Sequence, residues 1–136
     1  MTVFVLDSSA VLRFIDKEAG WNRVSDILVA HLTQTAEIAI PAVQWGEIAG
    51  QVRKRLGVPG QNRVMEKLAE FQPRIESVTS ERAVRAAAIK VDRKISYADA
   101  IALDLAMDSP DCVLVSADFG FKAVTDLARI EFLPAK

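Results

Sequence analysis

The feature of this sequence that most constrains its fold is a regular alternation between short apolar runs and longer segments with helical periodicity. Most of the runs consist almost wholly of apolar or β-branched residues, as strands buried on both faces do. Between them, apolar residues recur at intervals of three and four, which is the spacing of one helix face. This alternation predicts an α/β domain built around a mostly parallel sheet. The predicted strands are Val3–Leu6, Glu37–Ile40, Arg74–Val78, Cys112–Ser116 and Ala128–Leu133.

The clearest helical stripe runs through Trp45, Ile48, Val52 and Leu56. Directly after it, the sequence Gly-Val-Pro-Gly at residues 57–60 predicts a turn between two helices. The chain of 136 residues shows no internal repeat and no linker. We therefore predict one domain over residues 1–136, which is an ordinary domain size.

Composition excludes several classes of protein. The chain has a single cysteine, Cys112, and a single histidine, His31, which excludes a disulfide framework and the usual Cys/His zinc sites. Lys and Arg number 17 against 18 Asp and Glu, so no basic excess indicates a protein that coats DNA. The first apolar run stops at Asp7, too short for a signal peptide, and no apolar stretch approaches a membrane span. We expect a cytoplasmic protein without a membrane partner.

Four acidic residues fall where a parallel α/β sheet places its functional groove, beyond the carboxyl ends of the strands. Asp7 follows the first predicted strand and Asp118 follows the fourth. Asp99 lies in the first turn of the helix before that fourth strand. Glu47 lies in the helix after the second strand and points nearly opposite the apolar stripe. We therefore expect these four carboxylates to converge.

Converging carboxylates repel one another and remain ionised only if a cation neutralises them. Oxygen-only ligands suit Mg²⁺ or Mn²⁺, and such sites support phosphoryl chemistry. Each acid also has a purely structural interpretation: Asp7, Asp118 and the Ser96–Asp99 pair are suited to helix capping, and Glu47 to a solvated helix face. Their shared position at the strand ends favours a metal site.

Hydroxyl and basic side chains extend this hypothesis. Ser9 and Ser116 stand beside the predicted acids, where a hydroxyl can orient a metal-binding carboxylate or simply cap a helix. Neither of the usual glycine-rich nucleotide loops is present. Between Gln51 and Lys67 the local charge is +4, which predicts a basic rim suited to a phosphodiester substrate. The basic residues are Arg53, Lys54, Arg55, Arg63 and Lys67.

Five blocks covering nearly the whole chain resemble the PIN-domain ribonucleases, and more narrowly the VapC-type toxins of toxin–antitoxin pairs. The opening block is Leu-Asp-Ser-Ser-Ala-Val-Leu at residues 6–12, followed by Lys-Glu-Ala-Gly at 17–20. The block around Glu47 is Val-Gln-Trp-Gly-Glu-Ile at 43–48, and the third acidic block is Ser-Tyr-Ala-Asp-Ala-Ile-Ala-Leu at 96–103. The last is Val-Leu-Val-Ser-Ala-Asp at 113–118, with Ser116 where the family more often has Thr.

The resemblance implies a three-layer α/β/α fold with strand order 3-2-1-4-5. It implies a Mg²⁺- or Mn²⁺-dependent endoribonuclease in which Asp7, Glu47, Asp99 and Asp118 hold the metal and act in catalysis, with Ser9 and Ser116 behind them. It also implies a cognate antitoxin that inserts a segment into the groove, and a homodimer. We expect the dimer surface along Trp45, Ile48, Val52 and Leu56.

Three other functions compete with this interpretation. A phospho-receiver switch also binds Mg²⁺, but it needs paired acids after the first strand, and here Asp7 is followed by serines. A dehalogenase-type phosphatase needs Asp-x-Asp at the same place, and its second acid is missing. A catalytically silent PIN fold used only for binding usually lacks some of the acids, whereas this chain has all four.

Overall fold

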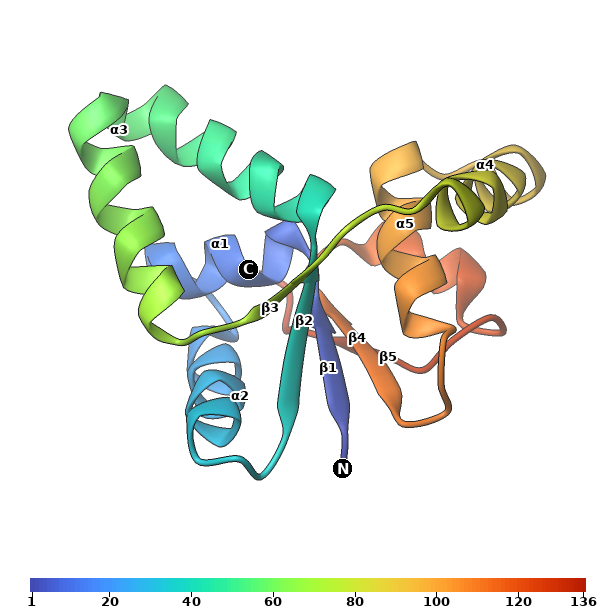
Figure 1. The fold of residues 1–136 in the computed structure, drawn as a ribbon, viewed down its shortest axis with the longest axis horizontal. Helices are drawn as coiled ribbons and strands as arrows, with labels where there is room; N and C mark the ends of the chain where they lie inside the picture. Colours follow the sequence, from blue (N-terminus) through green and yellow to red (C-terminus); the bar gives the residue numbers. More distant parts are fainter.

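The computed structural model describes residues 1–136 and contains a five-stranded sheet with helices on both faces (Figure 1). The strand order is β3-β2-β1-β4-β5 and every neighbouring pair is parallel, which confirms the predicted fold class. The strands are β1 (Val3–Leu6), β2 (Glu37–Pro41), β3 (Arg74–Glu76), β4 (Cys112–Ser116) and β5 (Ile130–Phe132). The helices are α1 (Ser8–Asp16), α2 (Trp21–Leu32), α3 (Ala42–Glu70), α4 (Ser80–Arg93) and α5 (Tyr97–Ala106), with a 3₁₀ helix η1 (Phe119–Val124).

Successive residues of the central strands face opposite layers of helices, as the pleat requires. Leu6 and Val115 point toward α1, α2 and α3 and belong to one core cluster. Val5 and Leu114 belong to a second cluster that includes residues of α5 and η1. Figure 1 shows α1, α2 and α3 on one side of the sheet and α4 and α5 on the other. Because both faces are covered, β1 and β4 are apolar except for Ser116 at the end of β4.

Helix α3 consists of two arms that meet at a sharp bend (Figure 1). The first arm lies before Gly57 and the second arm lies after it. Gly57 has φ 70° and ψ −174°, a conformation that L side chains rarely adopt. Gly60 lies so close to Leu56 that a Cβ atom there would collide with that side chain. The predicted turn at residues 57–60 is therefore confirmed. Although α3 is the longest helix, no helix of the structure is long and apolar enough to cross a membrane.

The first arm of α3 corrects the expected dimer surface. Ile48 and Val52 are fully buried in the core of the single chain, and Trp45 is partly buried against the same cluster. Only Leu56, 55% exposed, is free for a partner. The prediction of a partner surface along this stripe is thus wrong for Ile48 and Val52, whose side chains lie in the core of the single chain. The periodicity identified an apolar helix face correctly, but the sheet and not a second molecule covers it.

The two edge strands are shorter than predicted. Strand β3 ends at Glu76 because its partner β2 ends at Pro41, directly opposite, where the chain turns into α3. Strand β5 pairs only with residues 114–116 of β4, so it spans Ile130–Phe132. An edge strand has hydrogen bonds to one neighbour only, so its length follows that neighbour. The boundaries of β1 and β4, which are paired on both sides, match the prediction.

Candidate active site

Asp7 stands at the carboxyl end of β1, between the ends of its neighbours β2 and β4. Its side chain is almost completely buried, with 2% exposed. It is also the N-cap of α1, because its Oδ1 accepts a hydrogen bond of 2.9 Å from the Ala10 amide. The capping interpretation is therefore correct for Asp7. It does not exclude a second role, because a capping carboxylate retains further acceptor positions.

Two serine hydroxyls connect Asp7 to the end of β4. Ser9 Oγ donates to Asp7 Oδ1 at 2.7 Å, and Ser116 Oγ donates to Asp7 Oδ2 at 2.5 Å. The same two hydroxyls also accept hydrogen bonds from the backbone that follows β4. The Ala117 amide donates to Ser9 and the Asp118 amide donates to Ser116, both at 2.9 Å. These contacts hold both oxygens of Asp7 and fix the backbone of Asp118 relative to it.

Asp118 begins η1 and is exposed to solvent. Its Oδ1 accepts a hydrogen bond of 2.9 Å from the Gly120 amide, so Asp118 is also a cap. Because Ser116 binds the Asp118 backbone and the Asp7 side chain at once, the two aspartates are placed by one hydroxyl. The Ser-Ala-Asp sequence at residues 116–118 therefore places Asp118 close to Asp7 through the Ser116 hydroxyl.

Glu47 approaches the site from the first arm of α3, where Ser8 Oγ donates to its Oε1 at 3.3 Å. One turn earlier on the same helix, Gln44 is buried and uses both ends of its amide. Its Oε1 accepts the Ser8 amide at 2.7 Å, and its Nε2 donates to the Ala98 carbonyl at 2.9 Å. Sequence reasoning missed Gln44. The signal was its position four residues before Ile48, which makes it a polar residue on the buried face of α3.

Asp99 completes the set from the first turn of α5, which Ser96 caps by accepting the Asp99 amide at 3.1 Å. Burial is the main cause that raises the pKa of Asp99 from its ordinary value of 3.8 to about 6. The negative charges of Asp118, Asp7 and Glu47 raise it further, in that order. The other three predicted acids therefore all lie within electrostatic range of Asp99.

Burial also raises the pKa of Asp7 to about 6, although the hydroxyls of Ser116 and Ser9 and the amide of Ala10 oppose the shift. No arginine or lysine forms an ion pair with Asp7, Glu47, Asp99 or Asp118. Desolvated carboxylates without a cationic partner either take up a proton or bind a cation. The donor set consists only of carboxylate oxygens, which fits a hard divalent ion.

The four carboxylates are neighbours, but no three of them already surround one point at ligand distance. Two causes are visible in the contacts. Both oxygens of Asp7 are turned toward serine hydroxyls and an amide, and carboxylates of like charge repel one another when no cation lies between them. A cation would reverse the second cause, because each carboxylate would then be attracted to the same point.

A polar depression of about 410 Å³ adjoins the acids on the α1 side. Ser9 and Ala117 link it to the site, and Arg55 from the first arm of α3 lines it. Arg55 donates to Asp16 at 2.9 Å, so the one member of the predicted basic rim in this depression is already paired with a carboxylate. The other lining residues are Leu12, Arg13, Asp16, Glu18, Gln51 and Lys136.

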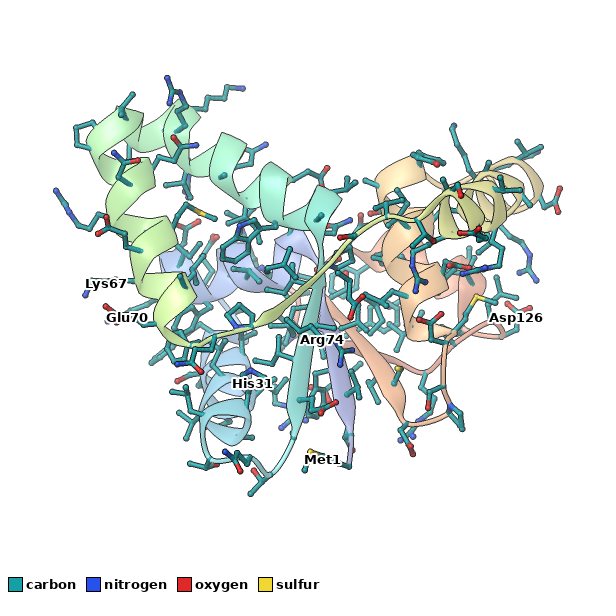
Figure 2. All side chains as sticks on the ribbon, viewed as in Figure 1. Met1, His31, Lys67, Glu70, Arg74 and Asp126 are labelled. Atoms are coloured by element: carbon teal, nitrogen blue, oxygen red, sulfur yellow. The ribbon has the colours of Figure 1, made fainter.

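His31 lies away from this edge, on α2 (Figure 2). Its Nδ1 accepts the Ile38 amide at 3.1 Å, so its Nε2 carries the proton and donates to the Gln72 carbonyl at 2.8 Å. These two bonds tie α2 to the segments that enter β2 and β3. His31 thus connects elements of the fold by hydrogen bonds, and the acidic site has no histidine.

Residues 4–127 match the PIN domain family, and the chain therefore belongs to that family. Its fold is similar to that of VapBC2 from Rickettsia felis, whose structure includes a DNA fragment from the promoter. That likeness has a TM-score of 0.76 at 12% identity and covers 98% of this chain and 100% of the other. No curated protein is significantly similar to this chain in sequence.

Two further solved structures have the same fold. DNA-bound VapBC from Salmonella typhimurium gives a TM-score of 0.72 at 16% identity, covering 97% of this chain and 98% of that one. FitAcB from Neisseria gonorrhoeae gives 0.70 at 19% identity, covering 94% and 96%. At these identities the likeness establishes a shared fold.

Proposed function

We propose that this protein is a divalent-metal-dependent endoribonuclease that hydrolyses phosphodiester bonds in RNA. The observation that carries the proposal is the set of Asp7, Glu47, Asp99 and Asp118 at the carboxyl edge of a PIN-domain sheet, without one cationic side chain paired to them. Such a set suits a hard cation from solution, and Mg²⁺ or Mn²⁺ is an ion that carboxylate oxygens prefer.

Asp7, Glu47, Asp99 and Asp118 are the residues that would hold the ion. When bound, a divalent cation acts as a Lewis acid toward a phosphate oxygen and lowers the pKa of water. Ser9 and Ser116 hold the two oxygens of Asp7 in place, and Ser8 donates a hydrogen bond to Glu47. The polar depression next to Ser9 offers the sugar–phosphate backbone a place beside the acids, with Arg55 on its wall.

The products test the chemistry as well as the activity. Cleavage by the RNA's own 2′-hydroxyl commonly relies on a base and an acid near neutral pH, and the site has no histidine. We therefore expect water to attack, leaving a 5′-phosphate and a 3′-hydroxyl. Purified protein should cut RNA with Mg²⁺ or Mn²⁺ and stop in EDTA, and mass spectrometry should identify the ends. Undiminished cleavage in EDTA, or 2′,3′-cyclic phosphate ends, would contradict this mechanism.

We propose further that the protein is the toxin of a toxin–antitoxin pair. VapBC complexes share its fold, and an apolar depression of about 240 Å³ between α1, α2 and the second arm of α3 offers a surface for a partner. Lys17 and Lys67 stand beside the aromatic wall of Phe14, Trp21 and Phe71, which favours an amphipathic helix with acidic flanks. Copurification with the product of a neighbouring small gene tests this, and Phe71→Glu should release that partner.

A homodimer remains a prediction, but the apolar stripe of α3 is no longer its expected surface. With Ile48 and Val52 buried, the exposed apolar residues Val84 and Val91 on α4 are better candidates, at 71% and 74% exposed. They lie seven residues apart, on one helix face. Analytical ultracentrifugation of Val91→Lys against the unchanged protein tests whether this face associates.

A further inference from the structure

Gln44 is the only glutamine buried in the core, with 1% of its surface exposed. It stands on the face of α3 that also carries Ile48 and Val52, where an apolar residue would ordinarily pack. Burying an amide costs free energy unless both its donor and its acceptor find partners. A glutamine at this position therefore needs an explanation beyond filling space.

Both ends of the Gln44 amide bind backbone next to a predicted metal-binding acid. Its Oε1 accepts the amide of Ser8, the residue after Asp7, at 2.7 Å. Its Nε2 donates to the carbonyl of Ala98, the residue before Asp99, at 2.9 Å. These partners lie 36 and 54 residues away in the sequence, so the two hydrogen bonds join three separate segments.

The third segment is the helix of Gln44 itself, which presents Glu47 one turn further on. Ser8 is therefore held twice by α3, through its amide to Gln44 and through its hydroxyl to Glu47. The carboxylates on these segments repel one another in the absence of a cation. A rigid connection through backbone atoms opposes that separation without neutralising any of the charges.

We propose that Gln44 is a positioning residue that fixes the spacing of Asp7, Glu47 and Asp99 so that the three can share one divalent ion. This inference rests on the proposed function. Gln44 does not touch the ion or the RNA. It acts through the Ser8 amide and the Ala98 carbonyl, so its loss should weaken metal binding while the core remains filled.

The test is Gln44→Met, which keeps the length and most of the volume of the side chain but removes both hydrogen bonds. We expect Mn²⁺ binding to the RNA-free protein, followed by titration calorimetry, to weaken by about 10- to 100-fold, the effect typical of losing a group that orients a ligand. At subsaturating Mn²⁺, kcat should fall while KM for RNA changes by less than about threefold, and saturating Mn²⁺ should restore part of kcat.

The matched control is Val52→Ala, on the same helix and equally buried, which creates a small cavity but removes neither of the Gln44 hydrogen bonds. It should lower the melting temperature and leave Mn²⁺ affinity unchanged. If Gln44→Met does not fold, Gln44→Asn replaces it. Asn keeps the polar amide but is one methylene too short to reach both partners, so it should weaken Mn²⁺ binding in the same way.

Mn²⁺ affinity equal to wild type in a folded Gln44 variant would overturn the inference. The inference would also fail if a Gln44 variant weakened Mn²⁺ binding no more than Val52→Ala does at an equal loss of stability. A wild-type protein that binds no Mn²⁺ and cuts no RNA would instead refute the proposed function, so the two failures are distinguishable.

Discussion

Two aspartates are buried in this protein to nearly the same degree, but one has cationic hydrogen-bond partners and the other has only neutral ones. Asp104 on α5, 3% exposed, receives hydrogen bonds from two arginines of α4, Arg82 at 2.7 Å and Arg85 at 3.1 Å. Asp7, 2% exposed, receives two serine hydroxyls and one amide, and no cation. One buried charge is neutralised within the fold and the other is not.

We propose that this difference separates a structural acid, Asp104, from a functional one, Asp7. An ion pair of a buried carboxylate with arginine helps to join two helices, here α4 and α5. A buried carboxylate surrounded by hydroxyls stays available to whatever cation arrives, and until then its pKa is raised to about 6. Asp104 belongs to the packing of the fold, whereas Asp7 belongs to its chemistry.

The largest expected effect is on activity, from Asp7→Asn. Removing this charge should reduce RNA cleavage by on the order of 10²- to 10³-fold, as the loss of one preorganised charge-stabilising group does. A gel assay with end-labelled RNA at saturating Mg²⁺ measures it. Asp104→Asn, assayed well below its melting temperature, is the matched control and should cut RNA at nearly the normal rate. Equal losses in both variants would abolish the distinction between the two acids.

The next effect is on stability, from Asp104→Asn itself. The substitution leaves Arg82 without its buried partner, although Asp108 still binds that guanidinium at 2.6 Å. Breaking a buried ion pair by removing one partner costs roughly 3–5 kcal/mol, and the remaining bond to Asp108 should keep the loss near the lower figure. Urea denaturation should show a markedly lower midpoint for Asp104→Asn than for the unchanged protein. A midpoint within experimental error of wild type would mean that Asp108 alone holds α4 to α5.

A smaller effect is the pH dependence of stability in the absence of metal. The pKa of Asp7 is about 6 in the folded chain against an ordinary value of 3.8, so the folded state keeps this proton to higher pH. The contribution of Asp7 is therefore fully present below about pH 4 and is lost as pH rises through about 6. In chelator, Asp7→Asn should gain roughly 1–3 kcal/mol over wild type between pH 4 and 7.

Denaturant titrations at pH 4 and pH 7 measure the difference in unfolding free energy between Asp7→Asn and the unchanged protein. Added Mg²⁺ should reduce the gap at pH 7, because the ion then stabilises the wild-type carboxylates. A difference between the two proteins that does not change with pH would contradict the assigned burial cost.

The smallest effect on stability is expected from Glu47→Gln, because Glu47 is exposed and its one side-chain contact is the 3.3 Å hydrogen bond from Ser8. Its unfolding free energy should change by less than about 0.5 kcal/mol, as for most surface substitutions. Thermal melts in chelator measure it, and RNA cleavage should nevertheless fall. A large destabilisation would place Glu47 with Asp104 among the structural acids.

The sequence was sufficient to predict where the strands lie and which acids follow them. Apolar runs reveal the strands, and the residues directly after each strand are then known. Asp7 and Asp118 could be found in this way. Gln44 could not be singled out, because a lone glutamine in a helix carries no motif, and its two partners are backbone groups that no pattern displays. The face of Ile48 and Val52 was recognised as apolar, but periodicity does not tell whether a sheet or a second molecule covers it.

The bond between Ser116 and Asp7 spans 109 residues of sequence. At synthesis rates of about 5–20 residues per second, Asp7 is made roughly 5–20 s before Ser116. During that interval β1 lacks its neighbour β4, and neither Asp118 nor the hydroxyl that orients Asp7 exists. A chain whose synthesis has not yet reached Ser116 therefore has no assembled set of acids, and the arrangement at the sheet edge forms only when the last fifth of the chain has been made.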